Sequence, residues 1–193
     1  MLGAMRRGLK WLGFSVLIAL AVTIAGYWIW LPSASVMDRE SYAAMSAYIE
    51  SGLTGESHDL GSVNRPVILY GRTTNGMFRI LPPTWSRFDS RMMRFEAVMR
   101  SLTSHRFERN FRLPAPYIFT NDRSMAASDL TEAQQRAGYG TITFSKVIFN
   151  HNATHAVFYT EHLCGLCGSG EFVAMEKRSG RWVVIDEQGT WIS

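Results

Sequence analysis

The sequence predicts an α+β fold in which an N-terminal transmembrane helix precedes amphipathic helices packed on a C-terminal antiparallel β-meander. Three observations predict it: an uncharged apolar run near the start, two stretches with apolar residues at helical spacing, and a last third rich in β-branched and aromatic residues. The chain has 193 residues, of which 47% are hydrophobic. That is enough for one hydrophobic core, so we expect a single folded domain over residues 38–193.

Residues 11–31 contain no charged side chain and are long enough, as a helix, to cross a hydrocarbon layer of about 30 Å. Arg6, Arg7 and Lys10 precede this run, and aromatic residues lie at both of its ends, which is typical of an anchor with a cytoplasmic N-terminus. The rival interpretation is a signal peptide cleaved near residues 33–35, but the length of the run and its bulky aromatic end favour an uncleaved anchor.

These features predict the organisation of the chain. We expect a cytoplasmic basic segment at 1–10, a single-pass anchor in the inner (plasma) membrane at 11–31, a linker at 32–37 and an exported, periplasmic domain at 38–193. The formal net charge is +4. Because three basic residues precede the anchor, the rest of the chain is almost neutral, which argues against a nucleic-acid partner.

A first amphipathic helix is expected over residues 38–51, with Gly52 as its C-cap. Four large side chains recur there at helical spacing: Tyr42, Met45, Tyr48 and Ile49. A β-type run follows at 67–70, and a turn signal at 73–76 predicts a returning strand at 77–81.

A second helix is expected over residues 89–102, with an arginine-rich flank. From residue 85 to 112 arginines outnumber acidic residues, and the candidate binding residues of this stretch are Arg87, Arg91 and Arg94. Such a run could bind anionic lipid headgroups or an acidic envelope protein. The alternative is a solvated helix face without a partner.

A further strand at 117–120 and a short helix at 131–138 lead into the final section. Four runs rich in β-branched and aromatic residues then follow, separated by short turn signals, and the chain ends in Trp191-Ile192. They predict the strands of the antiparallel meander at 141–149, 154–161, 171–177 and 181–186. A cystatin-like or NTF2-like arrangement is the specific analogy for helices on one face of such a sheet.

The stretch 145–193 also carries a series of short motifs. They are Ser145-x-Val147-x-Phe149-Asn150, Ala156-Val157-x-Tyr159, Cys164-Gly165-Leu166-Cys167-Gly168-Ser169-Gly170, Glu176-Lys177-x-x-Gly180-x-Trp182-x-Val184 and Trp191-Ile192-Ser193. As a string they resemble the C-terminal block of a group of uncharacterised bacterial exported proteins. The resemblance implies a common sheet and an exported location, and it implies no catalytic residue.

Cys164 and Cys167 form the most distinctive motif. In an exported domain we expect them to form a disulfide in a tight glycine-rich turn. A redox dithiol would need a βαβ setting, which the flanking sequence does not predict. A zinc site would need two further ligands beside the pair, and one C-x-x-C is a weak signal for it even with His162 close by. We therefore expect no metal and no cofactor.

The sequence contains no G-x-S-x-G, H-E-x-x-H or phosphate-binding glycine loop. His155 and His162 are the candidates for a general base beside an acid. Two hypotheses follow. The first is a membrane-anchored, non-enzymatic binding module of the cell envelope. The second is an exported enzyme with a histidine and carboxylate pocket in the α+β domain.

Overall fold

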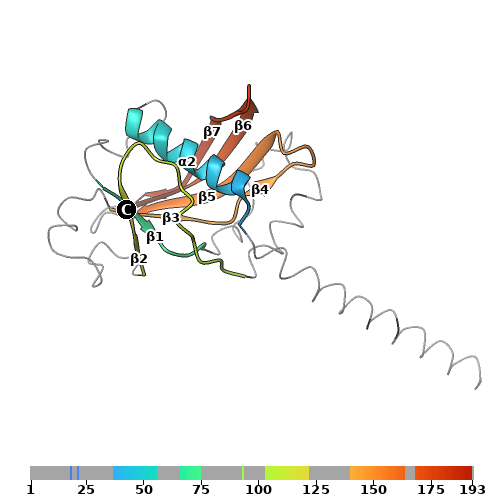
Figure 1. Ribbon diagram of the computed structural model, residues 1–193, viewed down its shortest axis with the longest axis horizontal. Helices are drawn as coiled ribbons and strands as arrows, with labels where there is room; N and C mark the ends of the chain where they lie inside the picture. Colours follow the sequence, from blue (N-terminus) through green and yellow to red (C-terminus); the bar gives the residue numbers. More distant parts are fainter. Residues whose placement is uncertain are drawn as a thin grey trace, which may run out of the picture. The chain divides into compact units, whose positions relative to one another are not determined.

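The chain forms two compact units, Met1–Val36 and Met37–Ser193. The computed structural model describes residues 37–55, 66–74, 93, 103–121, 140–163 and 168–192, together with residues 18 and 21. All the strands described below belong to the second unit (Figure 1).

The helix α2 spans Arg39–Thr54. The side chain of Asp38 caps its first turn, because Oδ1 accepts a hydrogen bond of 2.7 Å from the Ser41 amide. Gly55 ends the helix in the left-handed conformation, with φ at 73°. The predicted first helix is therefore present, but its C-cap is Gly55, and Gly52 is buried within the last turn.

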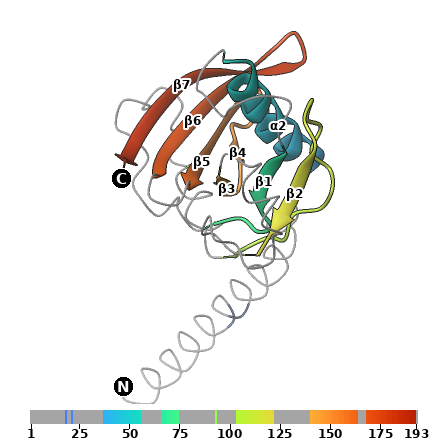
Figure 2. The ribbon, with the colours of Figure 1, turned by 90° about the vertical axis from the view of Figure 1, so that its left-hand side faces the viewer.

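Within the described residues the sheet has seven strands, in the order β2-β1-β3-β5-β6-β7 with β4 paired to β5 (Figure 2). Strand β1 is parallel to both β2 and β3, and the pairs from β3 to β7 are antiparallel. The strands are β1 (Val67–Tyr70), β2 (Tyr117–Thr120), β3 (Thr141–Phe144), β4 (Ile148–Phe149), β5 (His155–Leu163), β6 (Gly168–Arg178) and β7 (Arg181–Ile192).

The predicted fold class is wrong, because the sheet is mixed and is not an antiparallel meander with several helices packed on it. Residue patterns locate a strand but do not name its neighbour, and parallel neighbours are joined by long connections that leave no local turn signal. The strand expected at 141–149 is interrupted, since Ser145 to Val147 lie between β3 and β4. The returning strand at 77–81 and the helices at 89–102 and 131–138 lie outside the described residues, apart from Met93.

Within the part of the chain that the structure describes, no helix is long and apolar enough to cross a membrane. This finding contradicts the predicted transmembrane signal anchor and the single-pass membrane localisation that depended on it, while the segment boundaries at residues 10, 31 and 37 stay predictions. The prediction depended on the residue types of the run and its flanks. Residue types show that a segment is apolar, but they do not show that its backbone forms a long helix. Of that run only Ile18 and Ala21 are among the described residues.

Apolar side chains cover both faces of the sheet. On one face a large cluster joins α2 to the strands, and in it the Tyr48 ring meets the Phe158 ring edge-on at 5.6 Å between centroids. On the other face a smaller cluster includes Tyr159, Phe172 and Met93. Residues along β5 and β6 alternate between the two clusters. Those of the large cluster pack against α2, which therefore lies on one face of the sheet and forms one wall of the site described next.

Candidate functional site

Several sequence-predicted site residues lie outside the described part of the chain. Arg87, Arg91 and Arg94 are among them, and so are Cys164 and Cys167. The four residues from 164 to 167 connect β5 to β6, whose ends are paired from Leu163 to Gly168. No disulfide lies among the described residues, which include neither cysteine, so the predicted disulfide between Cys164 and Cys167 stays a prediction.

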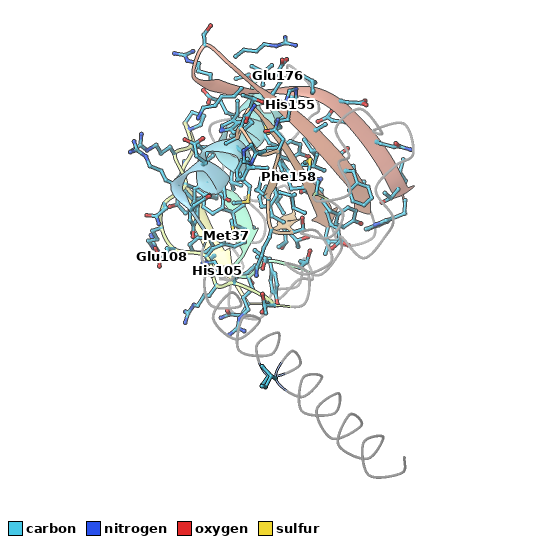
Figure 3. All side chains as sticks on the ribbon, turned by 90° about the vertical axis from the view of Figure 1, so that its right-hand side faces the viewer. Met37, His105, Glu108, His155, Phe158 and Glu176 are labelled. Atoms are coloured by element: carbon cyan, nitrogen blue, oxygen red, sulfur yellow. The ribbon has the colours of Figure 1, made fainter. Side chains whose placement is uncertain are left out.

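His155 lies near a carboxylate, as the enzyme hypothesis requires, but it takes part in a turn. Its Nε2 atom is 3.9 Å from Glu176 Oε1, and Figure 3 shows the two side chains together. Asn150 Oδ1 accepts hydrogen bonds from the backbone amides of Thr154 and His155, and Asn150 Nδ2 lies 3.2 Å from His155 Nδ1. The histidine therefore stabilises the connection between β4 and β5.

His162 does not join His155 in one site. The two are seven positions apart on β5, so their side chains point to opposite faces of the sheet. Ile142, which belongs to the helix-side cluster, is the cross-strand partner of His162. His155 instead faces Glu176, whose neighbour Lys177 points to the helix side. The sheet thus separates the two candidate bases.

A polar groove runs along α2 and was not predicted. We call it the α2 groove, and it consists of three neighbouring cavities on the described surface. The central cavity, of about 250 Å³, lies between the first half of α2, residues 110–112 and the start of β7. The arginine cavity, of about 420 Å³, adjoins it through Arg39 and Arg112. The distal cavity, of about 270 Å³, adjoins it through Trp182.

Two residues that line the central cavity carry hydroxyl groups, and each hydroxyl accepts a hydrogen bond from the backbone. Tyr42 Oη accepts a hydrogen bond of 2.8 Å from the Glu108 amide, and Ser46 Oγ accepts one of 3.0 Å from the Arg112 amide. Because a hydroxyl also carries one hydrogen, each can still donate. Among the described residues neither hydroxyl donates a hydrogen bond, so both hydrogens are available to a bound acceptor.

Burial keeps the Tyr42 hydroxyl in its protonated form. Tyr42 is only 3% exposed, and this burial is the main cause that raises the pKa of its phenol above 10.0. At neutral pH the group is therefore a donor and never a phenolate.

Glu40 is the carboxylate of the central cavity, and its charge is compensated. Its Oε2 atom accepts hydrogen bonds from Lys177 Nζ at 2.7 Å and from Trp182 Nε1 at 3.0 Å. The hydrogen bond from Lys177 is the largest cause that lowers the pKa of this carboxyl. Lys177 also lies over the Trp182 ring, 5.5 Å from its centroid. Trp182 is 6% exposed and packs on Phe149, which fixes this wall to the core.

The rim of the groove carries uncompensated positive charge. Arg39 lies at the first turn of α2, and Arg109 and Arg112 follow from the segment that packs beside it. All three are exposed, and within the described ranges none of them forms an ion pair with a carboxylate. A guanidinium presents several N–H donors in a planar fork that matches carboxylate and phosphate groups.

The groove therefore combines cationic side chains at its rim with hydroxyl donors on its floor. Its described residues include no group of three metal-binding side chains. Comparisons with protein-family models, with curated proteins and with solved structures each returned no match. The chemistry of the groove is therefore what bears on the function of this chain.

The sequence contained part of the signal for this site. Arg109 and Arg112 belong to the arginine-rich stretch from 85 to 112. The predicted candidates were earlier arginines of that stretch, in or next to the expected helix. Arg39 and Lys177 had no signal at all, because only the folded chain brings α2, the 109–112 segment and the end of β6 together.

Proposed function

We propose that the Met37–Ser193 unit is a binding module that recognises an anionic ligand in the α2 groove. One observation carries the proposal: in the described part of the chain Arg39 and Arg112 form no ion pair, and they line the same cavity as two hydroxyl groups that donate no hydrogen bond there. This arrangement presents donors to the cavity from its rim and from its floor. An oxyanion such as a carboxylate or phosphate group is the matching ligand, because it offers acceptors in several directions.

The size of the central cavity supports a ligand larger than a single water molecule. At about 30 Å³ for each water, its volume of about 250 Å³ corresponds to about eight waters. A phosphate or carboxylate group fits this space with room for the atoms that carry it. The Glu40 carboxylate supports the choice of ligand from within the protein, since Lys177 and Trp182 already hold one oxyanion at this wall.

The enzyme hypothesis has less support. Its requirement was a concave site in which His155 or His162 meets a carboxylate. The pair of His155 and Glu176 exists, but the three described cavities are lined by neither histidine. Lys177 lines the central cavity while its neighbour Glu176 points to the opposite face. The pair therefore faces away from the groove.

The test is calorimetric titration of the protein with inorganic pyrophosphate at low ionic strength. A hydrogen bond to a charged group contributes about 1.5–3 kcal/mol, so Arg39→Gln and Arg112→Gln should each weaken binding about 10-fold to 100-fold. Arg72→Gln is the matched control, because Arg72 is exposed and lines none of the three cavities, and its affinity should stay within about twofold of the parent. Equal affinities in all three variants, or no binding to the parent protein, would refute the proposal.

A further inference from the structure

The α2 groove is longer than a small anion requires. Its central cavity shares Arg39, Tyr42, Asn110 and Arg112 with the arginine cavity, and it shares Trp182 with the distal cavity. The three cavities therefore follow α2 in sequence, from Arg39 in its first turn to Thr54 in its last. A helix of 16 residues is about 24 Å long, so the groove can hold a chain-like ligand.

Charged side chains line all three cavities, and the excess positive charge lies in the arginine and central cavities. Five cationic side chains line the three cavities, and two carboxylates accompany them. The cations are Arg39, Arg109, Arg112, Lys177 and Arg181, and the carboxylates are Glu40 and Glu50. Glu40 is hydrogen-bonded to Lys177, and one cation and one carboxylate line the distal cavity. The excess positive charge is therefore that of Arg39, Arg109 and Arg112. A single carboxylate would leave most of this charge uncompensated.

The distal cavity differs in its chemistry. It is lined by Ala47, Val183 and Val184 beside Arg181 and Trp182. Val183 is one of the large hydrophobic side chains that the described surface exposes, at 38%. An apolar side chain of the ligand can cover it, and this contact contributes in proportion to the apolar area removed from water.

On these grounds we propose that the occupant of the α2 groove is an extended acidic segment of a partner protein, with an aliphatic residue at one end. The proposal rests on the proposed anion-binding function and specifies its ligand. An extended chain rises about 3.3 Å per residue, so about seven residues cover the length of α2. Its carboxylates would bind Arg39, Arg109 and Arg112, and its aliphatic residue would lie on Val183.

The walls of the groove favour a polypeptide over a lipid surface. Binding to a bilayer uses exposed apolar side chains that insert between lipids. On the described rim, the side chains around the arginine cavity are polar or buried: Tyr42, Met37 and Phe111 are 3%, 7% and 6% exposed. A groove with buried aromatic walls and charges above them suits a narrow chain that enters it.

The test uses the whole protein and a fluorescein-labelled peptide of six glutamates followed by one leucine, with fluorescence anisotropy as the readout. We expect the peptide to bind at least about tenfold more tightly than inorganic pyrophosphate, because several charged contacts act together. Arg112→Gln should lower the affinity of the protein for both the peptide and pyrophosphate. Arg181→Gln and Val183→Ser should each lower the affinity for the peptide about 3-fold to 10-fold. The affinity for pyrophosphate should stay within about twofold of the parent, because these residues line only the distal cavity.

The outcomes separate the two proposals. If pyrophosphate binds but the distal variants leave the peptide unaffected, the extended segment is refuted and the anion site stands. Binding of neither probe would refute both. The last arm uses phosphatidylcholine vesicles with and without phosphatidylserine. If the anionic vesicles bind the protein and the peptide does not compete with this binding, the acidic segment is also refuted. Arg181 and Val183 are exposed, and equal thermal unfolding of each variant and the parent verifies the fold.

Discussion

Tyr48 Oη donates a hydrogen bond of 2.5 Å to Glu171 Oε1, across 123 positions of the chain. The contact joins the middle of α2 to β6 on the helix side of the sheet. The Tyr48 ring also meets Phe144 and Phe158 edge-on, at 6.0 and 5.6 Å between centroids. One side chain thus contributes both aromatic packing and a charged hydrogen bond to the seating of α2, and the position of α2 defines the groove.

Replacement of Tyr48 by phenylalanine should lower the free energy of unfolding by about 2 kcal/mol, since it removes a hydrogen bond to a carboxylate and keeps the ring. Urea unfolding followed by circular dichroism measures the change. Tyr117→Phe is the matched control, because the Tyr117 ring packs on Phe111 and Phe119 while its hydroxyl makes no hydrogen bond within the described residues. A loss equal to that of the control would contradict the role of the Tyr48 hydroxyl.

Stability should fall at alkaline pH because of the same residue. Burial, followed by the charge of Glu171, raises the pKa of Tyr48 well above 10.0. The unfolded chain then releases this proton at lower pH than the folded one, so the stabilisation is complete below about pH 10 and is lost as the pH rises from there. Urea titrations at successive pH values should show this decline, and the decline should be smaller in Tyr48→Phe. Identical alkaline profiles for parent and variant would exclude Tyr48 as its source.

Stability should also fall at acid pH, and Glu40 should contribute to this fall. The hydrogen bond from Lys177 is the largest cause that lowers the pKa of this carboxyl below 4.5. Because a depressed pKa in the folded state stabilises the protein above the unfolded value, the contribution is present at neutral pH and disappears as the pH falls through the folded pKa. Glu40→Gln should therefore flatten the acid limb, measured by thermal unfolding between about pH 3 and pH 6. An acid limb in Glu40→Gln that is identical to that of the parent protein would contradict this role of Glu40.

The folded chain could be predicted from its sequence at the level of single elements. The spacing of Tyr42, Met45 and Ile49 predicted α2, and the β-branched runs predicted strands that overlap β5, β6 and β7. These signals are local, since side-chain spacing reports the periodicity of one segment. What a local pattern lacks is the identity of the neighbouring strand, so the parallel pairing of β1 with β2 and β3 was missed.

The groove could not be predicted for the same reason. Ser46 and Arg112 are 66 positions apart, and their hydrogen bond forms only after the segment from 105 to 112 has folded beside α2. Lys177 reaches Glu40 across 137 positions. The arginine-rich composition near residue 100 pointed to anions, but it did not identify which arginines lie on a concave surface.

Gly170 offers a test of the far end of the sheet. A Cβ atom at this position would overlap the hydroxyl of Tyr159 and the indole nitrogen of Trp191, which are joined by a hydrogen bond of 2.8 Å. Gly170→Ala should therefore lower the free energy of unfolding by about 1–3 kcal/mol, as overpacking does. Gly189→Ala is the control, because a Cβ there meets no atom within 4 Å. Chemical unfolding of both variants measures the difference, and equal stability would refute the close packing of Gly170.

The most direct measurement of the central claim is a crystal structure of the protein with inorganic pyrophosphate. We expect its oxygen atoms in the central cavity, at hydrogen-bond distance from the guanidinium groups of Arg39 and Arg112 and from the hydroxyls of Tyr42 and Ser46. Pyrophosphate bound only outside the α2 groove would contradict the account. A groove that stays empty in crystals grown at a saturating concentration of pyrophosphate would contradict it as well.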